Sequence, residues 1–168
     1  MEQFEDESEE LVDEAQLVIF KLDNEEYGVD IMQVKEIIRV TDINKVPQVP
    51  DFVEGVISLR GEILPIINLR EKFGLLKKEK DKATRIIVVN IGSTTIGGIV
   101  DEVTEVLRIQ NSAIKPPPSV IKGVSSEYLL GIGQIGDRII ILLDMAKILS
   151  ANEMIKIKEI SEELNKNA

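Results

Sequence analysis

The sequence contains no cysteine and no histidine. Without cysteine, the chain can form no disulfide, no thiol nucleophile and no zinc–thiolate site. Without histidine, it also lacks the commonest general base and the commonest protein ligand for metals. These two absences leave few ways to build a catalytic site.

Tryptophan is also absent and aromatic residues make up only 4% of the chain, so the core must consist chiefly of isoleucine, valine and leucine. The formal net charge of −10 argues against nucleic-acid binding, which draws its affinity from basic patches. No apolar run approaches the roughly 20 residues that a membrane-spanning helix needs, and the acidic N-terminus is unlike a signal peptide. We therefore expect a cytoplasmic protein that binds no nucleic acid and does not insert into a membrane.

The chain is long enough to bury a sizeable core, with 168 residues of which 43% are hydrophobic. Residues 1–14 contain eight acidic residues and no basic one, which predicts a disordered, self-repelling tail. Near the other end, Met154, Ile157, Ile160 and Leu164 recur at three- or four-residue spacing. This spacing predicts a C-terminal helix over residues 152–164 that packs on the rest of the protein.

The densest β-signal lies in residues 52–69, where two runs of β-branched residues flank Arg60-Gly61-Glu62. We expect a hairpin with a tight turn in which Gly61 adopts a positive φ and Arg60 stands at the tip. The guanidinium there could bind a carboxylate or carbonyl group of a partner, or simply pair with Glu54 or Glu62 on a solvated turn. Pro65, inside the second run, predicts that this strand lies at a sheet edge or a bulge.

Shorter patterns predict the neighbouring elements. Residues 17–22 and 25–31 are typical of a hairpin turning at Asp23-Asn24, and apolar residues at three- and four-residue steps between Ile31 and Arg39 favour a short amphipathic helix. Residues 69–73 could form one helical turn that ends at Gly74.

The sequence also repeats itself. Shifting the chain by 69 residues aligns Leu17–Val40 with Ile86–Ile109 without a gap, and a shift of 76 aligns Gly55–Phe73 with Gly131–Leu149. The two shifts differ because the second copy lengthens one loop, where a duplicated unit tolerates insertion. We therefore predict an all-β protein of two similar small subdomains in tandem, packed together with a cleft between them.

Two motifs could suggest chemistry. The glycines of 131–136 match the dinucleotide-binding pattern, but the residues that follow are typical of a strand and not of the required helix, so we assign these glycines to a turn or bulge. Asp101, Glu102 and Glu105 could hold a divalent cation, as in a metal-dependent hydrolase. Alternatively, on a helix, Glu102 and Glu105 would face water beside Arg108. The sequence therefore predicts no catalytic, cofactor or metal site, with a hydrolase as the alternative.

Three stretches, 17–31, 52–70 and 127–131, strongly resemble CheW, the adaptor family of bacterial chemotaxis. The similarity covers residues 15–150, which we expect to form one CheW-like domain, with residues 151–168 as a C-terminal helix and tail. It implies two SH3-like five-stranded β-barrels, which we place at about 15–80 and 81–150. Ser58 departs from the family, which usually has asparagine before Leu-Arg-Gly. A fragment of the histidine kinase CheA or of the adaptor CheV is disfavoured, because no ATP-binding or receiver segment accompanies the module.

The resemblance also implies partners and sites. It implies a protein, monomeric when isolated, that is recruited to membrane-bound receptor arrays and links the cytoplasmic tip of a chemoreceptor to the regulatory domain of CheA. The receptor groove between the subdomains would be lined by Val18, Ile31, Val34, Ile37 and Val103, with Gly55 and Arg60 close by. The kinase contact would lie around Asp42, Ile43 and Val46.

Overall fold

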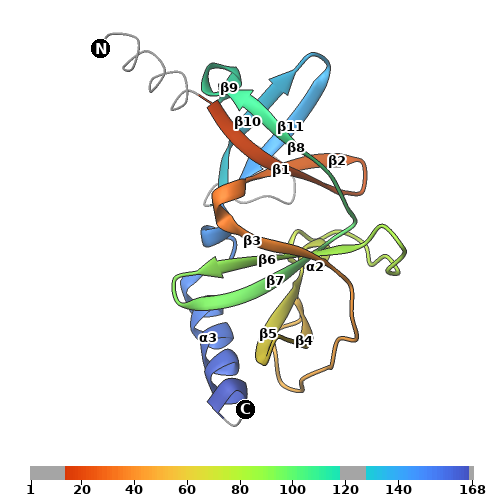
Figure 1. Cartoon of the computed structure of the whole chain (residues 1–168), viewed down its shortest axis with the longest axis vertical. Helices are drawn as coiled ribbons and strands as arrows, with labels where there is room; N and C mark the ends of the chain where they lie inside the picture. Colours follow the sequence, from red (N-terminus) through yellow and green to blue (C-terminus); the bar gives the residue numbers. More distant parts are fainter. Residues whose placement is uncertain (1–13, 118–127, 167–168) are drawn as a thin grey trace.

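The protein, described by a computed structural model over residues 14–117 and 128–166, consists of two β-sheets stacked end to end (Figure 1). The sheet drawn at the top, here the upper sheet, has the order β8-β1-β2-β11-β10-β9, and the lower sheet has the order β3-β6-β7-β5-β4. The upper strands are β1 (Glu14–Leu22), β2 (Glu25–Asp30), β8 (Glu102–Gln110), β9 (Ile114–Lys115), β10 (Leu129–Ile135) and β11 (Arg138–Leu143). The lower strands are β3 (Val34–Arg39), β4 (Val53–Leu59), β5 (Glu62–Asn68), β6 (Arg85–Ile91) and β7 (Thr94–Val100).

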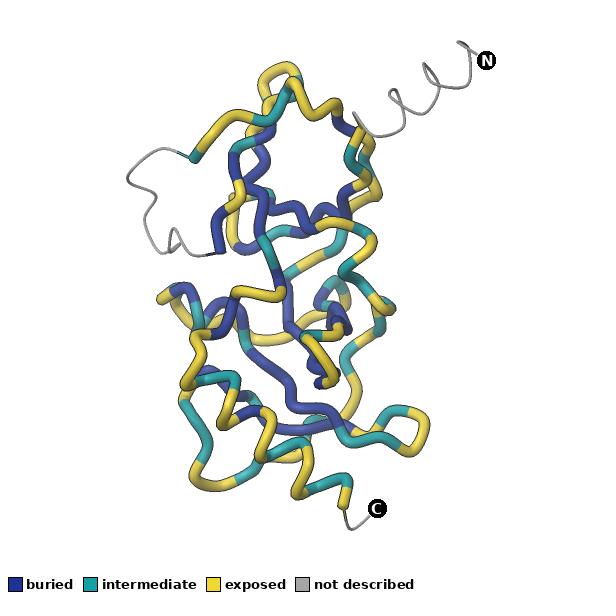
Figure 2. The backbone as a smooth tube through the Cα atoms, turned by 90° about the vertical axis from the view of Figure 1, so that its left-hand side faces the viewer, coloured by how far each residue is buried: buried dark blue, intermediate teal, exposed yellow. Residues whose placement is uncertain are grey.

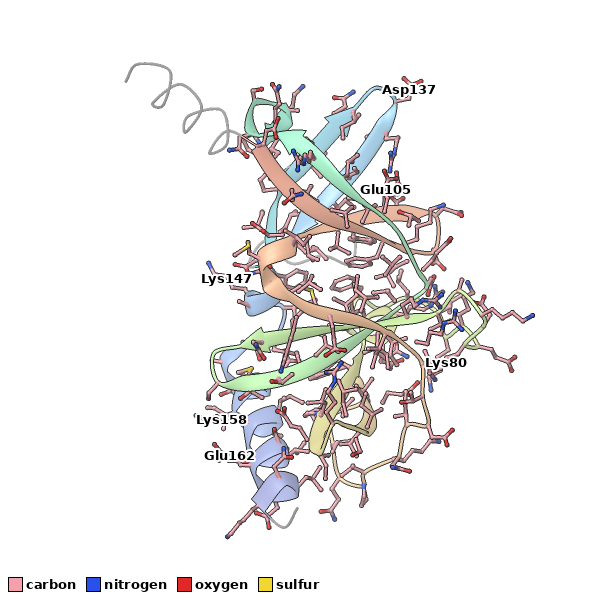
Figure 3. All side chains as sticks on the ribbon, viewed as in Figure 1. Lys80, Glu105, Asp137, Lys147, Lys158 and Glu162 are labelled. Carbon is pink, nitrogen blue, oxygen red and sulfur yellow. The ribbon has the colours of Figure 1, made fainter. Side chains whose placement is uncertain are left out.

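The mainly β fold and the C-terminal helix confirm the sequence predictions. The helix α3 (Ala151–Lys166) lies beside the lower sheet and buries Ile157, while Lys158 and Glu162 project outward from it (Figure 3). The predicted helical turn is α2 (Leu69–Lys72), and Gly74 follows it with a φ of +73°. Short 3₁₀ turns occupy η1 (Ile31–Gln33), η2 (Asn111–Ala113) and η3 (Met145–Lys147). The predicted acidic tail of residues 1–14 lies outside the described residues except for Glu14, which begins β1.

The sheets do not follow the expected division near residue 80. The hairpin β1–β2 belongs to the upper sheet with the strands that follow residue 101, whereas β3, β4 and β5 pair with β6 and β7 in the lower sheet. Each sheet therefore combines the first two strands of one sequence copy with the remaining strands of the other copy. The structural units are interleaved along the chain, so no single boundary separates them.

Strand for strand, the two sheets are equivalent under the sequence repeat. The bulge between Val53 and Gly55 in the lower sheet recurs between Leu129 and Gly131 in the upper sheet, 76 residues later. The parallel pair Ile66↔Gly97 has its counterpart in Leu142↔Gly28. Because pairing partners and irregularities recur at equivalent positions, the duplication fixes the register as well as the strand order.

Each sheet has an inner core, and a third core lies between the sheets. The inner cores use equivalent residues, such as Leu17 and Ile140 above and Ile86 and Leu64 below. The third, which we term the shared core, includes residues from both sheets and Ile157 of α3. Figure 2 shows this continuity as buried backbone in both sheets and in the middle of the molecule. Neither sheet could hide its outer face alone, so burial of the shared core holds the two together.

Aromatic rings cross the shared core as a column. The ring of Tyr27 stacks on Phe20 at a centroid distance of 5.5 Å and contacts Phe73 at 5.8 Å, and Phe73 stacks in turn on Tyr128 at 5.5 Å. Burial raises the pKa of the Tyr27 hydroxyl to about 12. Four of the chain's six Phe and Tyr residues thus join segments from both sequence copies.

The predicted helix over Ile31–Arg39 is wrong: only η1 is helical, and Val34–Arg39 form strand β3. A β-bulge between Val34 and Glu36 inserts an extra residue, so Val34 and Ile37 point to the same face although they are three residues apart. The bulge therefore imitates helical spacing. The equivalent bulge opposite Ile19 and Phe20 gives β8 the same spacing, which corrects the helix expected around Glu102 and Glu105.

The β4–β5 hairpin has the predicted tight turn, with positive φ at both Arg60 (49°) and Gly61 (81°). Strand β5 is not an edge strand, however, because it lies between β7 and β4. Its pairing with β7 begins only at Ile66, one residue after Pro65. The side that faces β7 is thus an edge over Glu62–Pro65, where proline's missing N–H leaves no ladder bond unmade.

Candidate functional site: the rim of the seam

The two sheets expose equivalent apolar side chains where their edge strands border the shared core. On β3, Val34 pairs with Val89 and Ile37 pairs with Ile87. Directly paired residues point to the same face of a sheet, and Val89 and Ile87 are both buried in the shared core. Val34 and Ile37 therefore extend the apolar face of the lower sheet to its edge.

The upper sheet does the same with β8. Val103 pairs with Phe20 and Val106 pairs with Val18, and both partners belong to the shared core. We define the seam rim as the apolar residues at these two edges: Ile31, Val34, Ile37, Val103 and Val106. Ile31, Val34 and Val103 are half-buried against the shared core, whereas Ile37 is 38% exposed and Val106 is 52% exposed. The rim is thus an apolar surface in contact with both the core and the solvent.

Val18, which the sequence placed in the groove, is only 1% exposed and belongs to the shared core. It is therefore removed from the candidate surface. The reason is its position on β1, which is flanked by β8 and β2, so that other strands cover what an edge strand would expose. The seam itself is filled, and only its rim is accessible at these positions.

Val106 is a rim residue that the sequence analysis did not select. It is the repeat equivalent of Ile37, and the two residues occupy the same place on their edge strands. The signal was present in the repeat, since a site carried by one copy has its counterpart 69 residues away. Transferring Ile37 through the repeat would have identified Val106.

Arg60 is fixed by a residue of the rim strand β3. Its guanidinium donates two hydrogen bonds to the carboxylate of Glu36, at 2.5 and 2.7 Å. The sequence had offered Glu54 or Glu62 as intramolecular partners, but Glu54 instead accepts from Lys80 at 2.7 Å. The bond from Arg60 lowers the pKa of Glu36 below its ordinary value. The Arg60 side chain remains 70% exposed, so its outer face is available to a partner beside the rim.

The upper sheet carries a related ion pair. Arg138, at the start of β11, bonds Glu26 at 2.8 Å and Glu105 at 2.9 Å. Glu105 is the repeat equivalent of Glu36, and Figure 3 shows it on β8. Each rim strand thus bears a glutamate that an arginine of the neighbouring hairpin holds.

Gly55 serves the packing of a neighbouring loop. A side chain there would place Cβ only 2.3 Å from the backbone oxygen of Asn44 and 2.8 Å from the Ile43 side chain. Asn44 in turn exchanges backbone hydrogen bonds with Val56 at 2.8 and 2.9 Å. Gly55 is therefore buried under residues 43–44 and holds in place the loop that was predicted to bind the kinase.

In that loop, Asp42 is exposed, and Ile43 and Val46 are half-buried. Ile43 packs against the inner core of the lower sheet. The three residues lie on the segment that joins β3 to β4, so this candidate contact belongs to the lower sheet.

The acidic residues considered for a metal site are engaged elsewhere. Asp101 bonds Arg70 at 2.6 Å, and Glu105 bonds Arg138. Across residues 14–117 and 128–166, no group of three acidic residues is arranged to hold a metal ion. The glycine-rich stretch 131–136 lies in β10 and the turn to β11, as predicted, with a strand following it. None of the described helices combines the length and apolar character needed to cross a membrane.

Comparison with known proteins places this architecture. The family model of the CheW-like domain matches residues 16–153. The chain is 40% identical to the chemotaxis protein CheW of Klebsiella aerogenes over 147 residues, covering 88% of this chain and 89% of that protein. It is 34% identical to CheW of Thermotoga maritima over 149 residues, covering 87% and 93%.

A solved structure agrees with the sequence relatives. The crystal structure of the scaffolding protein TtCheW from Thermoanaerobacter tengcongensis superposes with a TM-score of 0.77 at 39% identity, covering 83% of this chain and 94% of that one. The predicted fold of two SH3-like barrels derived from a duplicated unit is thereby confirmed. The chain therefore belongs to the CheW family of chemotaxis coupling proteins, whose members act as scaffolds.

Proposed function

We propose that this protein is a non-catalytic adaptor that couples the cytoplasmic tips of chemoreceptors to the histidine kinase CheA. Family membership supports this role, and the observation that carries it is the seam rim. Two edge strands present repeat-related aliphatic side chains that extend the buried core to the solvent. An apolar surface of this kind suits an amphipathic helix, the form expected of a chemoreceptor tip.

In this proposal the receptor helix lies on the rim. Half-buried Val34 and Val103 contact its apolar face, and the more exposed Ile37 and Val106 flank it. Arg60, held by Glu36, offers its remaining donors to a carbonyl or carboxylate group on the same helix. Because the side chains are already ordered by packing and by ion pairs, binding costs little additional conformational entropy.

The kinase contact is proposed on a separate part of the lower sheet. Asp42, Ile43 and Val46 lie on one loop, and Ile43 links that loop to the inner core. Docking of the regulatory domain of CheA there would leave the rim free for the receptor. The adaptor could then hold both partners at once in the cytoplasm, at receptor arrays, without a cofactor or a reaction of its own.

Val34→Lys tests the receptor contact. The substitution places a charge in the proposed interface, and we expect receptor affinity to fall about tenfold or more, as for other buried interface anchors. Because Val34 is only half-buried, its long side chain can reach water, and the circular-dichroism spectrum should be unchanged. Calorimetric titration with a receptor cytoplasmic fragment gives the affinity.

Ile155→Lys is the matched control, because Ile155 is an exposed aliphatic residue on α3, away from the rim. It should bind the receptor fragment like the wild type. A folded Val34→Lys variant that binds with wild-type affinity would remove Val34 from the site. An unfolded variant would show that Val34 is essential to the core.

A further inference from the structure

The chain passes between the sheets at two places that immediately precede the rim strands. It leaves the upper sheet after β2 through η1 and enters β3, and it leaves the lower sheet after β7 and enters β8 at Glu102. Gln33 directly precedes Val34, and Asp101 lies two residues before Val103. Whatever fixes these two crossings also fixes where the two sides of the rim begin.

At the second crossing, a buried ion network holds Asp101. Its carboxylate accepts a hydrogen bond from Arg70 at 2.6 Å and another from the backbone N–H of Asp23 at 2.8 Å. Its own N–H donates to the carbonyl of Lys21 at 3.1 Å. The crossing is thereby tied to the β1–β2 turn of the upper sheet.

Arg70 completes the network from the lower sheet. It belongs to α2, directly after β5, and is only 8% exposed. Besides Asp101, its guanidinium bonds Asp23 at 2.6 Å and the carbonyl of Leu76 at 2.8 Å. One planar fork therefore joins α2, the β1–β2 turn and the crossing, which lysine could not do with a single ammonium group.

The first crossing is held differently. Gln33 donates to Asp144 at 2.7 Å and accepts from the N–H of Met145 at 3.2 Å, which ties it to η3. The repeat equivalents of Arg70 and Asp101 are Ala146 and Met32, so the ion pair has no counterpart in the other copy. The repeat alone does not require Arg70, and its network is a feature of one side of the molecule.

We propose that Arg70 is a positioning residue for the seam rim. It fixes the crossing at Asp101 and so sets the position of β8, with Val103, relative to β3, with Val34. This inference rests on the proposed receptor-binding function of the rim. Without Arg70, the carboxylates of Asp23 and Asp101 would face each other uncompensated, and the crossing would shift to separate them.

The absence of native cysteine allows a direct test by paired spin labels. Lys35→Cys on β3 and Thr104→Cys on β8 place labels at exposed, repeat-equivalent positions. In this background, Arg70→Gln should shift or broaden the distribution of label-to-label distances measured by pulsed electron paramagnetic resonance. Lys72→Gln is the control, because Lys72 lies in the same helix but pairs with Glu153 of α3 and should leave the distribution unchanged.

Receptor binding provides the second measurement. Arg70→Gln should weaken binding of a receptor cytoplasmic fragment by about 2-fold to 30-fold, the range for residues that alter coupling without touching the ligand. Arg70→Lys should lie between Arg70→Gln and the wild type. If Arg70→Gln does not fold, Asp23→Asn removes one bond of the network at a more exposed position and should show a smaller change in both measurements.

The outcomes separate the two proposals. Unchanged distances in folded Arg70→Gln would overturn the positioning role, whatever happens to binding. Altered distances with wild-type affinity would also overturn it, because the rim would then tolerate displacement. If the wild-type protein itself does not bind the receptor fragment, the proposed function fails instead, and the distance measurement still reports whether Arg70 holds the crossing.

Discussion

The upper and lower sheets share one strand order and one register, yet they are finished differently. In the lower sheet, α3 lies along β5, and its residue Asn165 bonds both the N–H and the carbonyl of Ile63. In the upper sheet, the equivalent residue Ile139 is 55% exposed. The duplicated framework is therefore constant, and later additions such as α3 and Arg70 give the sheets their separate tasks.

The close approach of a loop to β4 should produce the largest difference between the sheets. A Cβ at Gly55 would meet the Asn44 backbone at 2.3 Å, and a Cβ at the equivalent Gly131 would meet the Lys115 backbone at 2.7 Å. We expect Gly55→Ala to destabilise the protein by about 3 kcal/mol and Gly131→Ala by about 1.5 kcal/mol, as for overpacked sites. Denaturant unfolding measures both values.

Gly98→Ala is the control for these substitutions, because its Cβ would make only ordinary contacts, at 3.4 Å or more from the Leu69 side chain. It should be nearly neutral. Equal costs at Gly55 and Gly131 would indicate that the two loops can move away equally well.

Removal of the link between α3 and β5 should have an intermediate effect. Asn165→Ala leaves both backbone groups of Ile63 without their side-chain partner, which we expect to lower the free energy of unfolding by about 1 kcal/mol. Lys158→Ala, on the outward face of α3 in Figure 3, should change it by less than about 0.5 kcal/mol. Equal stabilities of the two variants would show that α3 does not protect this edge through Asn165.

The smallest effect concerns the two arginine–glutamate pairs. Hydrogen bonds from Arg60 and Arg138 lower the pKa values of Glu36 and Glu26, respectively, below the ordinary 4.5. A lowered pKa in the folded state means that the bond's contribution is complete above pH 4.5 and is lost as the pH falls through the lowered value. Each pair should therefore remain intact at neutral pH.

Arg60→Gln should raise the pKa of Glu36 towards 4.5 and leave that of Glu26 unchanged, whereas Arg138→Gln should do the converse. Carboxyl-carbon NMR titration resolves the two glutamates. A shift of both pKa values in either variant would contradict the separation of the two pairs.

The sequence predicted the repeat, the β4–β5 hairpin, the C-terminal helix and most of the rim. It could not predict the exchange of β1–β2 between the copies, because a repeat shows which strands are equivalent and not which copy each strand pairs with. That choice depends on contacts between residues far apart in the chain, such as Leu17 with Leu107. The partner of Arg60 was missed for the same reason, since Glu36 lies 24 residues away.

Two local errors have a different origin. The β-bulge gives Val34 and Ile37 a helical spacing within a strand, so periodicity alone indicated the wrong element. Val18 is as aliphatic as the rim residues, and only its place on an inner strand makes it core. Composition and spacing identify apolar faces, but the order of strands in the sheet decides which of their residues reach the solvent.

The central claim is that both edges of the rim bind the same receptor helix. Ile37→Cys and Val106→Cys can each carry the protein's single thiol, labelled with a photo-crosslinker, and be irradiated with a receptor cytoplasmic fragment. Both should crosslink to the same short segment of that fragment, whereas Ile155→Cys on α3 should not. Crosslinking from only one edge, or from neither edge while the fragment is bound, would contradict the account.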